Sequence, residues 1–318
     1  MAVNPVRLSA KHQLAIALET SPGVMETLDE GDVLFIPNEL SFKTELDQKE
    51  RKLVKPFLGA DPPTPGLKKC TVSISLDMIG SGTPTTPPPW AILMTLLGFK
   101  GSAGTNKYTW TLESTPAIAT ATVWSNRGGL RRRGRGLCAV SGKISGEVGR
   151  PAELSVELQG AYDGYEDAEP FSQTLPRPVP PVVNAGAFTL GGSYSPFISK
   201  WELTIANTLA WRIKPDASSL IYFTEITSRR FSVTLAPEIE ALSTRDWLDS
   251  LESMTEEALE ITIGSEAGNK FRITAPNAVV VKAGEENDEE GKMTDAVELL
   301  LTPSYETGGN DEITIEQL

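Results

Sequence analysis

A proline-rich stretch near the middle of the chain constrains its folding more than any other feature. Residues 174–183 read Thr-Leu-Pro-Arg-Pro-Val-Pro-Pro-Val-Val, with four prolines within six residues. Proline has no amide hydrogen for a helix or a sheet ladder, and it biases the preceding residue toward an extended backbone. We therefore expect a stiff connector at 174–183 between a first domain at 1–173, which includes an N-terminal arm, and a second domain at 184–318.

The two parts share an order of predicted elements. Each contains a strand of alternating polar and apolar residues, then a short helix near a tryptophan, then a second strand, at 70–79, 90–97 and 108–113 and again at 230–239, 245–254 and 258–264. Strand patterns dominate the remaining sequence, and helix patterns are few and short. We therefore predict a mainly β fold, and the repeated order suggests a duplicated module.

Composition sets limits on stability and location. A chain of 318 residues with 40% hydrophobic content can bury its core without disulfides. Its two cysteines, Cys70 and Cys138, are too few for a disulfide framework and lack partners at metal-ligand spacing. The N-terminus has no apolar signal core, and no run approaches the ~20 apolar residues of a membrane span. We expect a protein made in a reducing cytoplasm, with no membrane segment.

The charge of the chain is acidic and unevenly distributed. The net charge is −13. Residues 1–175 have 18 basic against 19 acidic side chains, a balance of −1, whereas residues 176–318 have 11 against 23, a balance of −12. A general nucleic-acid binder needs a basic face for phosphates, so this class is disfavoured.

Catalytic and cofactor motifs are missing from the sequence. His12 is the single histidine and has no cysteine or carboxylate at triad or ligand spacing, so a packing or solvated role is expected. No Gly-x-Ser-x-Gly elbow is present, and Gly101–Gly104 lacks the spacing and the Lys-Ser/Thr ending of a phosphate loop. The sequence therefore predicts a protein that is not an enzyme and uses no cofactor or metal.

A glycine-rich basic segment lies between two apolar runs at 117–124 and 137–145, a pattern that predicts a β-hairpin with a mobile tip. We expect this basic hairpin to meet an acidic surface of an adjacent copy, because complementary patches fix the register between partners. The alternative is a disordered loop tip. The candidate contact residues are Arg127, Arg131, Arg132, Arg133 and Arg135.

An acidic run near the C-terminus is a second charged candidate. It lacks the spaced oxygens and central glycine of an EF-hand loop, so we interpret it as a solvated turn between two strands. It also supplies candidates for an acidic surface or a channel lining: Glu285, Glu286, Asp288, Glu289 and Glu290.

Short motifs follow one another in a distinctive order along most of the chain. The N-terminal ones are 15–23, Arg51 with Gly59, 75–82 and 89–98, and the C-terminal ones are 203–207, 268–278 and 309–315. Each motif alone is weak. In this order they resemble the tail tube (major tail) proteins of long, flexible-tailed bacteriophages.

The resemblance implies two tandem β-sandwich or barrel domains, each with a short flanking α-helix. It implies a structural virion protein that assembles in the host cytoplasm into stacked rings around a channel for DNA. This chain is about twice the length of a single tube module, so three copies would form a pseudo-sixfold ring, with a hexamer as the alternative. Other expected partners are the tape measure, tail terminator and baseplate proteins. DNA would pass without sequence-specific binding, because a wall of net negative charge repels phosphate.

Two alternatives remain at this stage. One is a distal tail or baseplate ring protein of similar fold, which would form a single ring. The other is a β-sandwich module that binds carbohydrate or a surface, which is favoured if exposed Trp201 and Trp211 stack a sugar. Tryptophans in alternating strands are more often buried.

Overall fold

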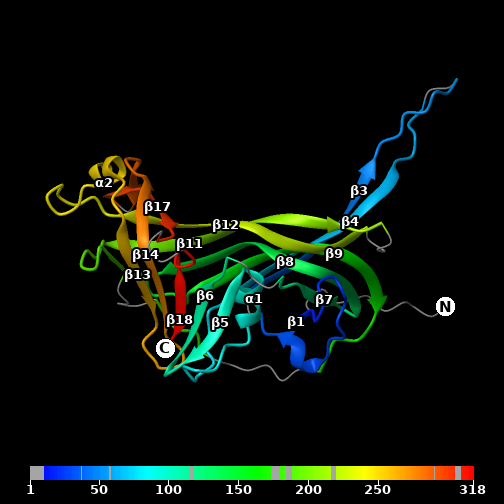
Figure 1. The fold of residues 1–318 in the computed structure, drawn as a ribbon, viewed down its shortest axis with the longest axis horizontal. Coiled ribbons are helices and arrows are strands. Elements are labelled where there is room, and N and C mark those ends of the chain that lie inside the picture. The colour runs from blue at the N-terminus through cyan, green and yellow to red at the C-terminus, as the bar shows by residue number, and fades with distance from the viewer. Residues whose placement is uncertain are drawn as a thin grey trace.

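A computed structural model describes most of the chain, namely residues 11–36, 38–56, 59–114, 118–172, 179–183, 188–215, 220–289, 291–304 and 309–318. Within these residues the fold is dominated by antiparallel strands, which confirms the predicted mainly β class. Figure 1 shows a body of long strands from which one hairpin projects as an arm. No closed barrel forms among the described strands.

The strands before the proline-rich connector are β1 (His12–Leu18), β2 (Val33–Leu34), β3 (Glu39–Lys49), β4 (Thr64–Asp77), β5 (Phe99–Gly104), β6 (Lys107–Leu112), β7 (Ala121–Arg127), β8 (Leu130–Glu147) and β9 (Glu153–Asp167). Those after it are β10 (Phe188–Leu190), β11 (Ile198–Ile213), β12 (Ile221–Pro237), β13 (Glu257–Ile263), β14 (Phe271–Lys282), β15 (Glu286–Glu289), β16 (Lys292–Asp295), β17 (Val297–Thr302) and β18 (Thr314–Gln317). The helices are a 3₁₀ turn, η1 (Glu30–Asp32), and two short α-helices, α1 (Ala91–Leu96) and α2 (Trp247–Ser253).

Eight of these strands form one continuous layer across both parts of the chain. Its order is β3, β4, β9, β8, β11, β12, β17, β14, and every pairing in it is antiparallel. Strands β7, β1 and β2 continue from β8, and β13 and β10 continue from β14. Strand β18 joins β14 to the hairpin of β5 and β6.

The core side of this layer explains why the two parts do not separate in the structure. One register row crosses the layer as Leu76, Leu154, Ile144, Leu203, Val233, Leu299 and Val280, all of which are buried. These strands alternate apolar and polar residues, so in-register pairing places every apolar member on the same face. The buried residues of both parts form one hydrophobic cluster.

Both predicted helices are present at the expected places. Helix α1 lies at Ala91–Leu96, two residues after Pro89, and its Leu93, Met94 and Leu96 are fully buried. Helix α2 is capped by Asp246, whose carboxylate accepts hydrogen bonds from the amides of Leu248 and Asp249 at 3.0 Å. Such a cap satisfies amide groups that have no partner inside the helix.

The two parts of the chain contain the same strand order. Before the connector the order is β3, β4, β9, β8, β7, β1; after it the order is β11, β12, β17, β14, β13, β10. In each part a helix follows the second strand of this order, since α1 follows β4 and α2 follows β12. The division into two domains nevertheless stays a prediction, and residues 174–178 of the connector lie outside the described residues. Val183 packs back on the first part, where its amide donates to the carbonyl of Arg150 at 2.8 Å.

Candidate assembly surfaces

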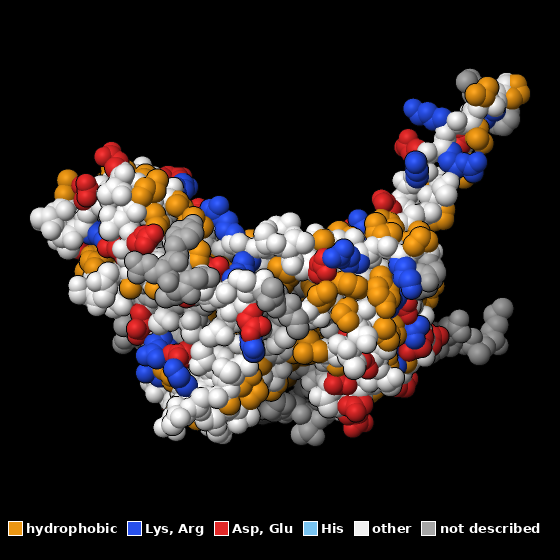
Figure 2. All heavy atoms as spheres, in the orientation of Figure 1, with side chains coloured by type: hydrophobic (Ala, Val, Ile, Leu, Met, Phe, Trp, Pro, Cys, Tyr) orange, Lys and Arg blue, Asp and Glu red, His pale blue; other side chains and the backbone are white. Residues whose placement is uncertain are grey.

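The hairpin of β3 and β4 projects from the body and is largely exposed toward its tip. It extends away from the body as an arm, with charged side chains along its length (Figures 1 and 2). Every residue of β3 from Lys43 to Lys49 is exposed, and among the described strands β3 pairs with β4 alone. An unpaired strand edge offers backbone N–H and C=O groups to another chain.

The described residues at the tip of the arm combine apolar exposure with local order. The side chain of Val54 is fully exposed and that of Leu53 is about half exposed. The carboxylate of Asp61 accepts a hydrogen bond from the amide of Leu53 at 2.9 Å and pairs with Lys55. These two contacts, that of the Leu53 amide first, hold the pKa of Asp61 below its usual value. The tip therefore presents apolar side chains on an internally bonded turn.

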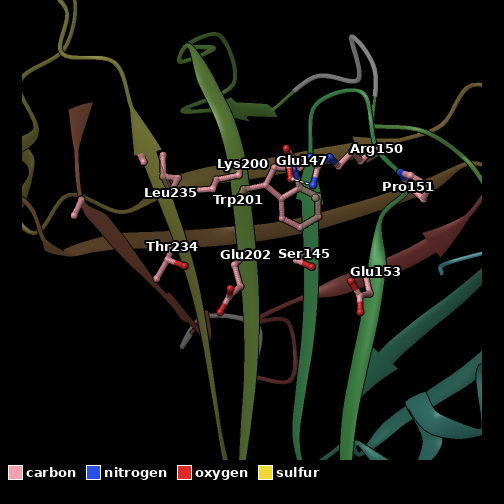
Figure 3. Close-up of a pocket in the computed structure, with 13 residues that line it drawn as sticks. Ser145, Glu147, Arg150, Pro151, Glu153, Lys200, Trp201, Glu202, Thr234 and Leu235 are labelled. Carbon is pink, nitrogen blue, oxygen red and sulfur yellow. Dashed lines mark ion pairs between the residues drawn. The ribbon is translucent and has the colours of Figure 1, made fainter. Parts of the chain in front are cut away.

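The solvent side of the eight-stranded layer carries a row of carboxylates. Following the strand register from β4 to β17, the row reads Asp77, Glu153, Ser145, Glu202, Thr234 and Glu298. Figure 3 shows four of these side chains, from Thr234 to Glu153, side by side on successive strands. From β4 to β17 the row contains four acidic residues, and on β14 the register partner of Glu298 is the basic residue Lys282.

This acidic row was not predicted from the sequence. The sequence shows which face of each strand is exposed, but not which strands pair. The alternation within each strand shows that Glu153 and Glu202 point away from the core. That they lie on one line depends on the pairing of β9, β8 and β11, which are distant in the sequence. Two further basic residues lie beside the row, since Lys143 pairs with Glu202 at 2.5 Å and Arg230 with Glu298 at 3.8 Å.

A shallow hollow of about 390 Å³ lies at one end of the layer, between β8, β9, β11 and β12. The indole of Trp201 packs there against Gly146, where a Cβ would lie 2.6 Å from the ring (Figure 3). Its lining mixes carboxylates, including Glu153 and Glu202, with Lys200 and Arg150. No histidine or cysteine is among the residues that line the hollow.

The structure places the predicted basic hairpin at β7 and β8, joined by the turn Gly128–Gly129. Most of its arginines contact carboxylates or carbonyls of the same chain. Arg131 and Arg133 pair with Glu166 at 3.2 and 3.4 Å, and Arg132 donates to the carbonyl of Phe42 at 2.9 Å. The contact of these arginines with a neighbouring copy stays a prediction. The same holds for Arg127, the fifth member of the cluster.

Two of these arginines are integrated into the packing of the first part. The Arg131 guanidinium lies over the rings of Trp124 and Phe171, at 4.6 and 5.0 Å from their centroids. Arg135 is buried and donates to the carbonyl of Gly23 at 2.6 Å and to Asp163 at 3.2 Å. Planar guanidinium groups suit both stacking and multiple hydrogen bonds, so these two contribute to the fold itself.

The acidic run forms a small hairpin separate from the main sheet, with β15 pairing β16. Glu286 and Asp288 are exposed, Glu289 lies 3.7 Å from Lys200, and Glu285 pairs with Lys282 at 2.5 Å. The Lys282 contact lowers the pKa of Glu285. Glu290 lies outside the described residues. The role of the run as an acidic surface or channel lining stays a prediction.

The remaining reactive groups are packed into the fold. His12 lies 3.1 Å from the Ser125 hydroxyl, and burial, followed by the charges of Arg127 and Arg132, lowers its pKa. Cys70 and Cys138 are free and buried, and burial raises the pKa of both thiols, that of Cys138 to about 12. Within the described residues no cluster of His, Cys, Asp and Glu could hold a metal ion.

Neither tryptophan of the carbohydrate-binding alternative is an exposed side chain. Trp201 is buried, and the ammonium of Lys69 lies over the half-buried ring of Trp211 at 5.1 Å from its centroid. Among the helices that the structure describes, none has the length and apolar character needed to cross a membrane.

Comparison with known proteins identifies the family of this β-rich chain. The family model for phage tail tube protein matches residues 9–317, which is nearly the full length and includes both repeated strand orders and the arm. A search of curated proteins found no match. The match and the mainly antiparallel fold agree with the resemblance seen in the sequence, and the chain belongs to the phage tail tube protein family.

Proposed function

We propose that copies of this chain assemble into rings, that the rings stack into the hollow tail tube of a long-tailed phage, and that DNA passes through this tube during ejection. The family match supports the tail tube role as a structural part of the virion. The observation that carries the assembly step is the eight-stranded layer, with its apolar row on one face and its polar row on the other. Such a layer can form the wall of a channel when copies are joined edge to edge.

We assign the acidic row to the inner surface of the tube. Asp77, Glu153, Glu202 and Glu298 lie on the layer face that is opposite the core. Carboxylates repel the phosphate backbone, whereas a basic row would release counterions and retain DNA in a salt-dependent manner. Because the four acids come from strands on both sides of the connector, both parts of the chain contribute to the lining.

Three copies per ring fit the repeated strand order better than six. Each copy contributes two sets of six strands in the same order, so three copies supply six similar units around an axis. A homohexamer is the alternative. The projecting arm, with its exposed Leu53 and Val54, would reach the adjacent ring, and the ends of the tube would meet tape measure, terminator and baseplate proteins.

Electron microscopy of the purified chain over a range of concentration and salt tests this function. We expect hollow tubes or stacked rings, with threefold classes that show six lobes. Single rings that never stack would favour the baseplate ring alternative. A chain that stays monomeric under all conditions would contradict self-assembly.

A charge test addresses the lining directly. A triple variant, Glu153→Lys, Glu202→Lys and Glu298→Lys, should still assemble but should retain linear DNA at low salt and release it at high salt. The matched control reverses three exposed acids outside the row and outside the acidic hairpin, Glu30, Glu169 and Glu266, and should retain less DNA. Equal retention by both variants would contradict the assignment of the acidic row to the lumen.

A further inference from the structure

The two repeated strand sets are joined within the chain by one pairing, between β8 and β11. Residues Ser141–Glu147 of β8 pair antiparallel with Lys200–Ala206 of β11. Strand β7 occupies the same edge of β8 as far as Leu137, opposite β9. Strand β11 therefore fills the edge of β8 that remains open where β7 ends.

Strand β11 and its hairpin partner β12 also cover the end of helix α1. The side-chain amide of Asn207 on β11 donates to the carbonyl of Leu97, directly after the helix, at 3.2 Å. A Cβ on Gly98 would lie 3.3 Å from the side chain of Ile226 on β12. With these contacts in place, Leu97 is only 1% exposed. Both the strand edge and the end of the helix are thus closed by the first hairpin of the second set.

The second set contains the same two features without a cover. Strand β14 corresponds to β8, and its Ala278 pairs on one edge with Leu301 of β17 and on the other with Glu257 of β13. Strand β13 begins at Glu257, so beyond Ala278 no described strand pairs with that edge, through Lys282.

In contrast to the covered end of α1, helix α2 and its C-terminal end expose apolar side chains. Its Leu248 is 54% exposed, and Met254, the residue that ends the helix, is 58% exposed. Leu242, just before the helix, is 72% exposed. Leu248 lies beside the end of β14, since a Cβ on Gly284 would be 2.8 Å from its side chain. Exposed apolar groups next to an open strand edge mark an interaction site. We name the Val279–Lys282 edge together with Leu242, Leu248 and Met254 the α2 slot.

The strand that corresponds to β11 in the first set is β3, and it is available. It pairs with β4 only and stands at the opposite end of the eight-stranded layer from β14. Because the layer has eight antiparallel strands, its two terminal strands run in opposite directions. Copies related by rotation about the strand direction therefore bring β3 beside β14 in antiparallel orientation, as β11 lies beside β8.

We propose that β3 of a second copy docks in the α2 slot, pairs antiparallel with Val279–Lys282 of β14 and covers α2. The partner is thus a second copy of this chain, and the joint reproduces between chains the β8–β11 joint within one chain. This inference rests on the proposed ring assembly and specifies its interface. It also implies that the site around α2 is incomplete without residues from the partner copy.

Cysteine cross-linking tests the joint. One variant carries Val279→Cys, and three others carry Glu39→Cys, Ser41→Cys or Lys43→Cys, the alternate β3 positions that cover the possible registers. Opposed positions in antiparallel strands lie within disulfide distance. Mixed pairwise, assembled and oxidised, at least one pair should yield covalent dimers, whereas each variant alone should not. Buried Cys70 and Cys138 should stay unreactive.

A control within the chain calibrates the chemistry. Lys143 and Thr204 are register partners in the β8–β11 joint, so the double variant Lys143→Cys and Thr204→Cys should close a disulfide within one chain, with or without assembly. Suppose that rings form and the control disulfide closes, but no mixture yields covalent dimers. This result would overturn the β3–β14 joint and leave the proposed function intact. Failure to form rings at all would overturn the proposed function, and the joint with it.

A charge in the slot provides an independent readout. Met254→Lys should leave the monomer folded, because its side chain is exposed there, but should raise the protein concentration needed for rings by about tenfold or more. Leu18→Lys, at an exposed apolar residue of β1, is the matched control and should have little effect on ring formation. Unchanged assembly of the Met254 variant would contradict the coverage of α2 by a partner.

Discussion

The side-chain amide of Asn207 on β11 donates hydrogen bonds to the carbonyl oxygens of Leu97 and Ala139, at 3.2 and 3.1 Å. Asn207 comes from the second part of the chain, and both acceptors come from the first. Carbonyl groups at the end of a helix have no partner inside it, and Asn207 supplies one for α1. A single buried side chain thus links β11 of the second strand set to β8 and to the end of α1 in the first part.

Replacing this amide should destabilise the chain measurably. Asn207→Ala leaves two buried carbonyl groups without their donor, at a cost of about 2 kcal/mol in the free energy of unfolding. Chemical denaturation followed by tryptophan fluorescence would measure the change. Thr204→Ala, on the solvent face of the same strand, is the control and should change stability by no more than about 0.5 kcal/mol. Equal effects would show that the amide hydrogen bonds contribute little.

Gly146 is expected to tolerate no side chain. Its position on β8 faces the indole of Trp201, and an added Cβ would lie 2.6 Å from the ring. Gly146→Ala should therefore displace the ring and destabilise the chain by about 1–3 kcal/mol. Thermal unfolding measures this effect, and Ser145→Ala, at the adjacent residue on the solvent face, serves as the control. A melting temperature equal to that of the control would contradict the close packing.

Arg135 is a buried arginine and Arg150 is an exposed one, so their replacement should affect stability differently. Arg135→Met removes a buried guanidinium that bonds Gly23 and Asp163, and should destabilise the chain by about 2–3 kcal/mol. Arg150 forms an exposed pair with Glu147 at 3.0 Å, so Arg150→Met should cost less than about 1 kcal/mol. Denaturation of the unassembled chain tests both. A loss of ring formation without a loss of stability in the Arg135 variant would instead indicate a contact between copies.

Glu316 should make the fold sensitive to acid. Burial raises the pKa of this carboxyl, but hydrogen bonds from Lys107 at 2.6 Å and Arg272 at 2.5 Å outweigh burial and hold the pKa below its usual 4.5. A lowered folded-state pKa stabilises the fold above the unfolded-state value, and this stabilisation is lost as the pH falls through the folded-state value. We therefore expect the melting temperature to decline below about pH 4.5, the usual value.

The conservative variant isolates the contribution of this residue. Glu316→Gln should cost about 2 kcal/mol near pH 7, because two cations lose a charged acceptor. Between pH 5 and pH 3, the free energy of unfolding of this variant should fall by about 2 kcal/mol less than that of the unsubstituted chain. Parallel pH profiles for the two proteins would mean that other carboxylates dominate the acid response.

Much of this protein follows from its sequence, because alternation and breaking residues act locally. The period-two patterns at 153–159 and 200–206 require strands with one apolar face, and Pro89 with Gly98 delimits the short helix at α1. The order of motifs along the chain also indicates the tail tube family. The repeated order of strand, helix and strand was visible in the same way.

Only the tertiary structure decided which strands lie beside one another. The alternation that places Glu153 and Glu202 on the solvent face does not reveal that both belong to one acidic row, because β8 stands between β9 and β11 and its register sets the alignment. Equally, the sequence marks Arg135 as one of a basic cluster, whereas packing places it against Gly23 and Asp163. Local patterns determine which face of a strand is buried, and long-range pairing determines which strands adjoin and which edges stay open.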